Sequence, residues 1–407
     1  MSRETPSVLI FSEMFPKPKS SSSGVFIVER LKALTELGVP FDFAPVSTFD
    51  NFPIRLVKKL KGYSPSESVK SVNLNEKHYP VLNVSLGLRD RIGLIRQEAN
   101  SWVKYARGMA TAIEKNKKIQ EFRLLHAHRV FPEGYAALLL SEKYNVPYIV
   151  TAHGGEIHSI SNNNKAFVKE VLEKAAKVIF VSKALMRDAS EKLDYDKSNG
   201  IVIPNGVDTN VFKPMDKEEA RRKMSLPLDK KIVGFVGNLM EVKGADRLPA
   251  IAEELMKLRS DVFFLIVGDG PLINTLRECM PTDLTHFAGR VEYELMPVVM
   301  NGIDVLVIPS RQEGFGTVIL EARACGARVV GTNVGGIPEA IGDERLLSSN
   351  SEDLSEELAQ RISWIISDEL EFDTVSHCVP SYDWHEIARK ERDIYEEIIG
   401  ETAKSHR

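Results

Sequence analysis

The sequence predicts an α/β protein with two doubly wound domains that face each other across a cleft. Short apolar runs that suit buried strands alternate along the chain with amphipathic helical segments. Glycine-containing turns follow several of these runs, at the strand ends where parallel sheets bind ligands. At 407 residues the chain is too long for one ordinary core, so two domains are expected.

The first series opens as strand, loop, helix and strand, which is the start of a parallel sheet. An apolar run at 7–12 precedes a loop rich in Ser and Pro that ends at Gly24, and a helix over 25–38 follows. We expect Gly24, at this turn, to lie beside a ligand. Further elements are expected as strands at 41–46, 122–127, 147–152, 177–182 and 200–205, and as a helix at 99–118.

Residues 47–100 are less regular, and one part of them is basic. The segment 52–63 (FPIRLVKKLKGY) interleaves Lys and Arg with apolar side chains. Such a helix can lie on an anionic membrane. The alternative, which we prefer because charge patterns of this kind are weak evidence, is a surface helix with solvated lysines.

A turn-rich stretch at 203–214 marks the domain junction, so the domains are expected at 1–205 and 206–383. The second series begins there, and a helical pattern at 384–399 ends the chain. Its strands are expected at 232–237, 262–268, 284–288, 304–309 and 328–332.

Composition narrows the class of protein. A net charge of −4 gives no electrostatic case for nucleic-acid binding. Three widely spaced cysteines, without a C-x-x-C pair, favour a reducing compartment. We see neither a signal peptide nor an apolar run of membrane-span length. The expected location is cytoplasmic, with peripheral contact at the inner membrane face through 52–63 as a variant of that prediction.

The most informative stretch is 304–326, which reads as strand, loop and helix. The helix expected at 317–325 begins with free backbone N–H groups, where an anion can bind. Glu313 lies in the loop and Glu321 about one turn into the helix, among apolar residues where an unpaired charge is costly. A ribose diol suits such a carboxylate, although the plainer alternative is one loop carboxylate and one helix-face carboxylate. We expect this element to bind an activated sugar.

Turns at neighbouring strand ends supply further candidates. Lys243 follows the strand-end residues Gly237 and Asn238 and could reach a phosphate, although a solvated turn lysine is the commoner outcome. Gly268 lies in a second turn, and Arg290 with Val291 in a third that could border a nucleobase. None of these turns is specific by itself. Together they favour a binding site, because they fall at successive strand ends of one sheet.

Three histidines lie near strand ends of the first domain. His126 and His128 share a strand face, and His153 follows the strand at 147–152. We find no carboxylate or third histidine at a supportive spacing, so we predict no metal site.

Together these residues resemble a known family. The segment from Glu313 to Glu321 (EGFGTVILE) is similar to the E-x7-E signature of retaining GT-B glycosyltransferases of family 4. The likeness runs through nearly the whole chain in order: the Gly24 loop, Thr151–Gly154 (TAHG), Pro204–Asp208 (PNGVD), Gly237–Gly244, Val267–Gly270 and Gly289–Val291.

The resemblance implies two Rossmann-like domains with distinct tasks. Residues 1–205, completed by a C-terminal helix at 384–407, would bind the acceptor. Residues 206–383 would bind a nucleotide sugar. Glu313 would hydrogen-bond the donor sugar and Glu321 the ribose. The proposed catalytic residues are Glu313, His153 and Lys243, with His153 beside the reacting carbon and Lys243 on the diphosphate.

The resemblance also implies the rest of the donor site. Asn238 stands where the family often has an arginine, and Arg290 or Arg311 would have to replace that charge. The backbone N–H groups of 315–318 would bind sugar and diphosphate, and Val291 would frame the base. The donor-binding residues are therefore expected to be Gly24, Asn238, Gly268, Arg290, Val291, Gly314, Phe315, Gly316, Thr317, Val318 and Glu321.

The predicted reaction transfers a sugar from a UDP-, GDP- or ADP-sugar to an acceptor hydroxyl, with retention of anomeric configuration. No metal or other cofactor is expected, and no nucleic acid. The acceptor is expected to be a glycan, a lipid-linked compound or a small molecule. Two alternatives stay open: a nucleotide-sugar epimerase of the same fold, and a non-catalytic protein that binds sugar nucleotides.

Overall fold

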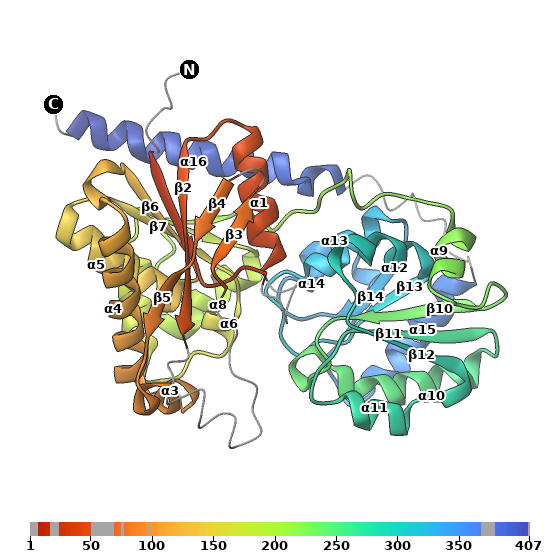
Figure 1. Cartoon of the computed structure of the whole chain (residues 1–407). Helices are drawn as coiled ribbons and strands as arrows, with labels where there is room; N and C mark the ends of the chain where they lie inside the picture. The colour runs from red at the N-terminus through yellow and green to blue at the C-terminus, as the bar shows by residue number, and fades with distance from the viewer. Residues whose placement is uncertain are drawn as a thin grey trace. The chain divides into compact units, whose positions relative to one another are not determined.

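Two parallel sheets, one in each of two units of the chain, organise the fold (Figure 1). The computed structural model describes residues 7–16, 24–49, 69–74, 77–96, 98–367 and 379–405. One unit comprises Met1–Pro204 and Ile387–Arg407, and the other comprises Asn205–Glu386. The sequence places the junction at 205/206, one residue away.

The first unit contains a seven-stranded sheet in the order β5-β2-β1-β6-β7-β8-β9, with every pairing parallel. Every residue of β1, β6 and β7 is buried, as expected for central strands covered on both faces. The strands are β1 (Val8–Ser12), β2 (Phe41–Phe49), β5 (Leu82–Ser85), β6 (Leu124–His128), β7 (Tyr148–Ala152), β8 (Lys177–Phe180) and β9 (Gly200–Val202).

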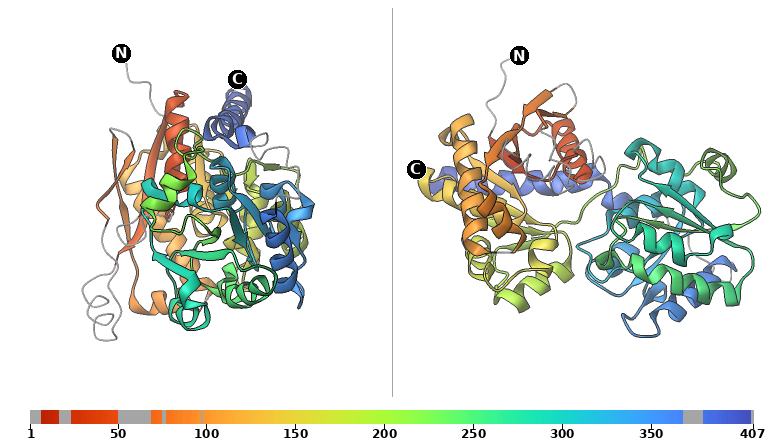
Figure 2. Two further views of the ribbon diagram at one scale, coloured as in Figure 1. Left: turned by 90° about the vertical axis from the view of Figure 1, so that its right-hand side faces the viewer. Right: turned by 60° about the horizontal axis from the view of Figure 1, so that its bottom comes forward.

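Helices cover both faces of this sheet (Figures 1 and 2). The C-terminal helix α16 (Trp384–Ser405) returns to the first unit, where Glu391 pairs with Arg30 of α1 (Val25–Glu36). The remaining helices are α3 (Leu88–Ile95), α4 (Ala99–Asn116), α5 (Tyr135–Tyr144), α6 (Gly155–His158), α7 (Lys165–Lys174) and α8 (Lys183–Leu193).

The irregular region of the sequence holds short elements that periodicity does not reveal. The strands β3 (Ser71–Leu74) and β4 (Lys77–Pro80) form an antiparallel pair, and β5 joins the edge of the main sheet. Each has only four residues, too few for a clear alternation. The basic segment 52–63 lies outside the described residues.

The second unit contains a six-stranded parallel sheet in the order β12-β11-β10-β13-β14-β15. Its strands are β10 (Lys231–Val236), β11 (Val262–Val267), β12 (Thr285–Gly289), β13 (Val305–Ile308), β14 (Arg328–Thr332) and β15 (Leu347–Ser348). Its helices are α9 (Lys217–Lys223), α10 (Leu248–Leu258), α11 (Ile273–Cys279), α12 (Met296–Gly302), α13 (Thr317–Ala324), α14 (Ile337–Ile341) and α15 (Leu354–Ile366).

Both sheets reverse their strand order beside their first strand. In the first unit the chain moves outward from β1 to β2 and later returns to β6, on the other side of β1. In the second unit it moves outward from β10 to β11 and β12 and returns to β13. Ligands of doubly wound sheets bind beyond the carboxyl ends of the strands at such a switch point. The loops after β1 and β6, and those after β10 and β13, therefore lie where such sheets bind ligands.

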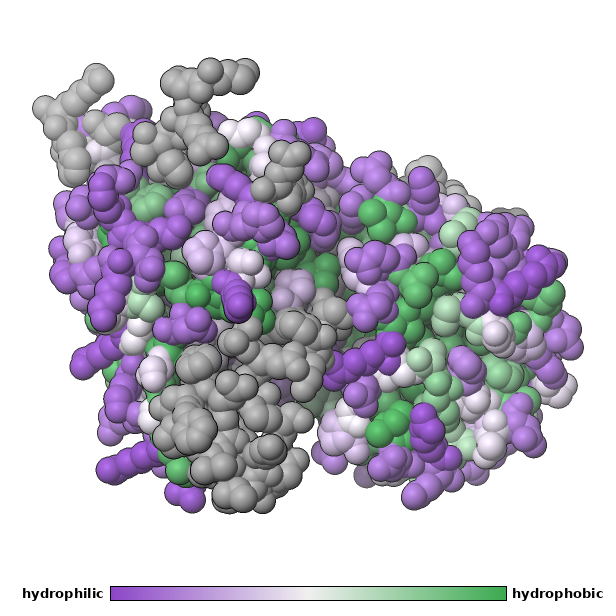
Figure 3. Space-filling model, in the orientation of Figure 1, coloured by the Kyte–Doolittle hydropathy of each residue, from purple (hydrophilic) through white to green (hydrophobic). Residues whose placement is uncertain are grey.

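On the face shown in Figure 3 the described surface is largely hydrophilic, with groups of apolar residues between the hydrophilic ones. Aliphatic residues of the strands form the cores instead, since Leu9, Ile10 and Leu306 are fully buried. Within the described ranges, no helix has both the length and the apolarity that crossing a membrane requires.

Candidate functional site

An ion pair joins the two loops at the switch point of the second unit. Lys243 Nζ lies 2.8 Å from Glu313 Oε2, and both side chains keep some exposure, 32% and 13%. Lys243 follows β10 and Glu313 follows β13, so adjacent strands of the sheet deliver the two charges to one place. The structure therefore brings together two of the three residues that the sequence predicts to be catalytic.

Close backbone packing fixes the Glu313 loop. A Cβ atom at Gly244 would overlap the carbonyl oxygen of Pro309, and one at Gly335 would overlap that of Glu313. Both glycines also have positive φ, which other residues rarely adopt. The Gly336 N–H donates to the Glu313 carbonyl oxygen at 3.2 Å. The Glu313 side chain thus projects from a loop that two neighbouring segments, at Gly244 and at Gly335 and Gly336, hold in place.

The helix α13 begins directly after this loop. Its N-cap residue, Gly316, has φ of 85°, and no side chain caps the helix. Its first N–H groups can therefore still bind an anion, as the sequence predicts for 316–318. Phe315 is 2% exposed and its ring packs on Tyr382 at 5.6 Å, so only its backbone can contact a ligand. Gly314, Thr317 and Val318 remain partly exposed.

Glu321 is a half-buried carboxylate one turn into α13. It makes no ion pair or side-chain hydrogen bond with any described residue of the chain. Desolvation by the surrounding protein raises its pKa to about 7. A carboxylate kept without a protein partner in such a place suits a ligand that brings its own hydroxyl groups.

The turns after the neighbouring strands pack closely against one another beside this site. A Cβ atom at Gly268 would overlap the Gly237 carbonyl oxygen, and Gly268 N–H donates to Gly289 O at 2.7 Å. Asn238 is exposed and Val291 half-buried. The predicted positions after β10, β11 and β12 are thus brought together.

The two arginines considered as substitutes for a charge at Asn238 are held in ion pairs. Arg311 makes two hydrogen bonds of 2.7 Å to Asp246 and one of 2.6 Å to the Glu241 carbonyl oxygen. Arg290 Nε lies 3.3 Å from Asp269 Oδ2. The Arg311 fork therefore orders the loop that carries Lys243 and has few donors left for a ligand.

In the first unit, His153 follows β7 and belongs to a row of imidazoles. Its Nε2 lies 3.2 Å from Nδ1 of His128, and its ring packs on Phe26 at 5.0 Å. Its backbone N–H donates to Glu156 at 2.8 Å. Gly24 lies at the start of α1, where a Cβ atom would overlap the backbone of Phe15. The backbone at Gly24 thus passes close to the loop after β1.

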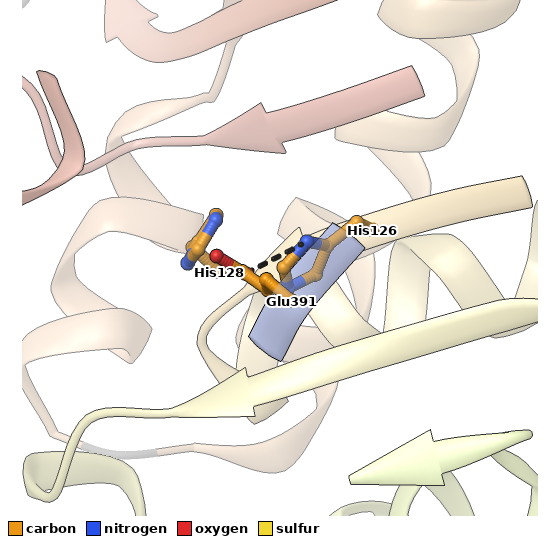
Figure 4. Close-up of side chains that lie close together, drawn as sticks. All are labelled: His126, His128 and Glu391. Carbon is orange, nitrogen blue, oxygen red and sulfur yellow. Dashed lines mark ion pairs between the residues drawn. The ribbon is translucent and has the colours of Figure 1, made fainter. Parts of the chain in front are cut away.

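The structure places a carboxylate beside the histidines, which the sequence did not reveal (Figure 4). Glu391 Oε1 lies 3.6 Å from His126 Nδ1 and 3.1 Å from Arg30 Nη1, with all three side chains fully buried. The sequence shows no carboxylate at a supportive spacing from the histidines, but the fold brings one to them. Glu391 follows His126 by more than 260 residues, so no local spacing could show the contact.

These residues fit a buried polar network better than a metal site. Both ring nitrogens of His126 are engaged, with the Tyr395 hydroxyl at 2.7 Å and the Thr151 hydroxyl at 2.8 Å. In the group of His126, His128 and Glu391, the atoms that lack a hydrogen-bond partner among the described residues are His128 Nε2 and Glu391 Oε2. Two such atoms are fewer than the protein ligands that a catalytic zinc usually has. The Arg30 guanidinium already supplies positive charge to Glu391.

The network also keeps the imidazoles neutral. Desolvation lowers the pKa of His126, His128 and His153 well below the ordinary value, and the charge of Arg30 lowers each further. His153 is therefore a neutral hydrogen-bonding group at physiological pH. One of His128 and His153 donates its proton to the other.

Comparison with known proteins identifies the family. A family model described as Glycosyl transferases group 1 matches residues 216–390, and one described as Glycosyltransferase Family 4 matches residues 83–211. The putative teichuronic acid biosynthesis glycosyltransferase TuaC of Bacillus subtilis is 29% identical over 353 residues, 84% of each chain. An uncharacterized glycosyltransferase of Methanocaldococcus jannaschii is 30% identical over 287 residues, 68% of this chain and 75% of that one.

Solved structures share the fold at low identity. Sucrose-phosphate synthase from Thermosynechococcus elongatus has a TM-score of 0.75 at 20% identity, covering 98% of this chain and 100% of its own. Anabaena HepE in complex with UDP has a TM-score of 0.70 at 18% identity, covering 96% and 100%. The predicted α/β architecture of two doubly wound, GT-B-type domains is confirmed, and the chain belongs to the group 1, family 4 glycosyltransferases.

Proposed function

We propose that this glycosyltransferase uses a nucleotide diphospho-sugar as donor and retains the anomeric configuration. The observation that carries the proposal is the Lys243–Glu313 pair beside the uncapped start of α13. An ammonium group and free helix N–H groups suit a diphosphate, and a carboxylate suits the hydroxyls of a sugar. Anabaena HepE, which shares the fold, has been solved in complex with UDP-glucose and with UDP, and those complexes add support.

Lys243 can bind the diphosphate while keeping its hydrogen bond to Glu313. A lysine ammonium has three N–H donors, and Glu313 accepts one of them. The remaining donors would bind phosphate oxygens together with the N–H groups of 316–318. Glu313 would accept hydrogen bonds from the donor sugar, and Glu321 from the two ribose hydroxyls.

Stabilisation of the departing diphosphate would supply most of the rate enhancement. The bond between the anomeric carbon and the phosphate oxygen breaks, and the nucleotide diphosphate leaves with the electron pair. The acceptor oxygen bonds to the anomeric carbon on the same face, and its proton passes to the departing phosphate oxygen. Neutral His153 would hydrogen-bond the sugar near that carbon. No protein nucleophile and no metal is needed in this scheme.

A binding panel tests the donor class. Thermal shifts would be recorded with UDP, GDP, ADP and their glucose or mannose conjugates. A ligand at 100 times its dissociation constant adds about 2.7 kcal/mol to the free energy of unfolding. We expect one nucleotide series to give a clear shift, whereas no shift with any of them would contradict the proposal.

Product analysis tests the stereochemistry. NMR of the product formed from an α-linked donor should show an α-linkage. A β-linked product would refute retention, and release of an epimerised free sugar would favour the epimerase alternative. Nucleotide binding without any turnover would favour a non-catalytic binding protein.

A further inference from the structure

The switch point of the first unit carries its own cluster of charges. Glu13 follows β1 and Arg129 follows β6, and these strands are neighbours in the sheet. Arg129 Nη2 lies 3.1 Å from Glu13 Oε2, and the two side chains are 25% and 20% exposed. The pair therefore lies where a doubly wound sheet binds ligands, and it can be reached from solvent.

A third residue holds this pair in place. Glu133 is fully buried; one of its oxygens accepts from Arg129 Nε at 3.0 Å and the other from the Glu13 backbone N–H at 3.1 Å. It thus fastens the loop after β1 and the Arg129 side chain to one anchor. A buried carboxylate of this kind adds little net stability, so its use points to the positioning of other groups.

The backbone at Arg129 has a conformation that a side-chain-bearing residue rarely adopts. Its φ of 94° lies in the region that favours glycine. Strain of this kind persists where the surrounding structure over-determines it, and it concentrates at functional sites. The rest of the fold holds Arg129 in this conformation through Glu133 and through the Arg129 N–H bond to Thr151 O at 2.9 Å.

Aromatic side chains and spare donors border the pair. Trp102 of α4 packs on Phe131 at 6.0 Å and on Tyr105 at 6.4 Å, and Tyr105 lies near Glu13 and Glu133. The buried Trp102 Nε1–H has no hydrogen-bond partner in the described chain, and Arg129 Nη1 makes no hydrogen bond there. Unsatisfied donors beside aromatic rings suit a sugar, which offers hydroxyl oxygens and an apolar ring face.

We propose that Glu13 and Arg129 form the acceptor subsite and that they bind an uncharged, hydroxyl-bearing compound, a sugar or polyol. This inference rests on the proposed transferase function and names the chemistry of its acceptor. A vicinal diol can donate to Glu13 and accept from Arg129 at once. A phosphate group would meet a guanidinium already neutralised by one carboxylate and a second carboxylate behind it.

The test compares acceptors and variants in the full chain. Binding would be measured by saturation-transfer NMR with methyl glycosides and myo-inositol, each matched by its phosphate ester, at about 10 mM to capture weak binding. We expect signal from at least one uncharged probe and a weaker signal from its ester. Preference for the ester, or no signal from any uncharged probe, would overturn the proposal.

Two variants and one control complete the test. Glu13→Gln and Arg129→Lys should each raise the acceptor dissociation constant, and the acceptor KM where turnover is found, about tenfold. They should leave the affinity for UDP unchanged. The control is Lys117→Gln, which breaks a pair of similar exposure with Asp42 at the amino end of β2. It should change neither quantity.

The outcomes separate this inference from the function on which it rests. Unchanged acceptor affinity in both folded variants would overturn the subsite while leaving the transferase intact. Absence of nucleotide binding and of turnover in the wild type would instead contradict the proposed function.

Discussion

The two switch points use the same backbone arrangement but opposite charge patterns. In the second unit the first strand delivers a cation, Lys243, and the returning strand a carboxylate, Glu313. In the first unit the first strand delivers Glu13 and the returning strand Arg129. The second unit adds an uncapped helix start, whereas the first adds the buried carboxylate Glu133. We therefore propose that the second switch point favours an anion and the first disfavours one, so that the side chains rather than the topology determine which ligand binds.

A third ion pair, between Arg30 and Glu391, differs from these two because it is fully buried. It links α1 to the returning helix α16. Neither side chain of this pair reaches solvent, whereas both switch-point pairs are partly exposed, so we expect this pair to stabilise the fold and the other two to bind ligands. The three pairs make separable predictions.

The largest expected effect is on stability, from Arg30→Met. This change leaves Glu391 buried without its cation and should lower the free energy of unfolding by about 3–5 kcal/mol. Urea denaturation measures it, with the exposed Lys174→Met as control, since Lys174 pairs with the surface carboxylates of Glu142 and Glu170. A loss below about 1 kcal/mol would show that this pair is not a structural anchor.

The next effect is on turnover, from Lys243→Ala and Glu313→Ala. Each should reduce kcat/KM by about 10²–10³-fold, since each removes a group proposed to stabilise the transition state. The matched control is Lys257→Ala, an exposed lysine of the same unit that pairs with Glu254. Near-normal turnover in either variant, with the control active, would remove that residue from the mechanism.

Glu321→Gln should reveal a pH dependence of stability. The folded-state pKa of about 7 lies above the ordinary 4.5, so the free energy of unfolding of the wild type falls as the pH rises from about 4.5 to about 7, where the unfolded carboxyl is ionised and the folded one still holds its proton. The free energy of unfolding of the variant, relative to that of the wild type, should therefore rise by about 1–3 kcal/mol between pH 4.5 and pH 7.5. Chemical denaturation across that range measures the gain, and a flat difference would mean that the pKa of Glu321 is ordinary.

The same carboxylate should make nucleoside binding depend on pH. Ionised Glu321 can accept two hydroxyl hydrogen bonds, and protonation removes part of that capacity. The affinity for a uridine nucleotide should therefore weaken as pH falls through about 7 in the wild type and stay level in Glu321→Gln. Equal pH profiles would separate Glu321 from the ribose.

The smallest effect is expected from Arg311→Ala. Its fork to Asp246 is partly exposed, so its loss should lower stability by about 0.2–1 kcal/mol. Because the fork orders the Lys243 loop, a threefold to tenfold rise in donor KM is expected as well, about 0.7–1.4 kcal/mol. A larger loss in turnover than in KM would assign Arg311 a direct part in the reaction.

Most of the second unit could be predicted from the sequence, because its signals are local. Buried parallel strands read as apolar runs, and Glu313, Gly316 and Glu321 fall within one strand–loop–helix. Lys243 could be named as a candidate, but its contact with Glu313 depends on which strands are neighbours. The order of strands in a sheet does not follow from their order in the sequence.

The first unit was harder, because its key contacts join distant segments. Glu13 lies in a loop that shows no distinctive sequence pattern. Its pairing with Arg129, 116 residues later, could be recognised only in the structure. The strands β3, β4 and β5 are too short to show alternation. The carboxylate beside His126 belongs to Glu391 of the last helix. The helical pattern of that segment predicted its apolar core face but did not indicate that Glu391 is buried with it.

We propose that the nucleotide diphosphate binds at the switch point of the second unit and not at that of the first. Isothermal titration of UDP into the wild type, Lys243→Ala and Arg129→Lys tests it most directly, with GDP or ADP in its place if the binding panel selects one of them. We predict that the dissociation constant rises about 10- to 100-fold in Lys243→Ala, the value of a charged hydrogen bond, and stays unchanged in Arg129→Lys. Equal affinity in the wild type and Lys243→Ala, or a comparable loss in Arg129→Lys, would contradict the assignment.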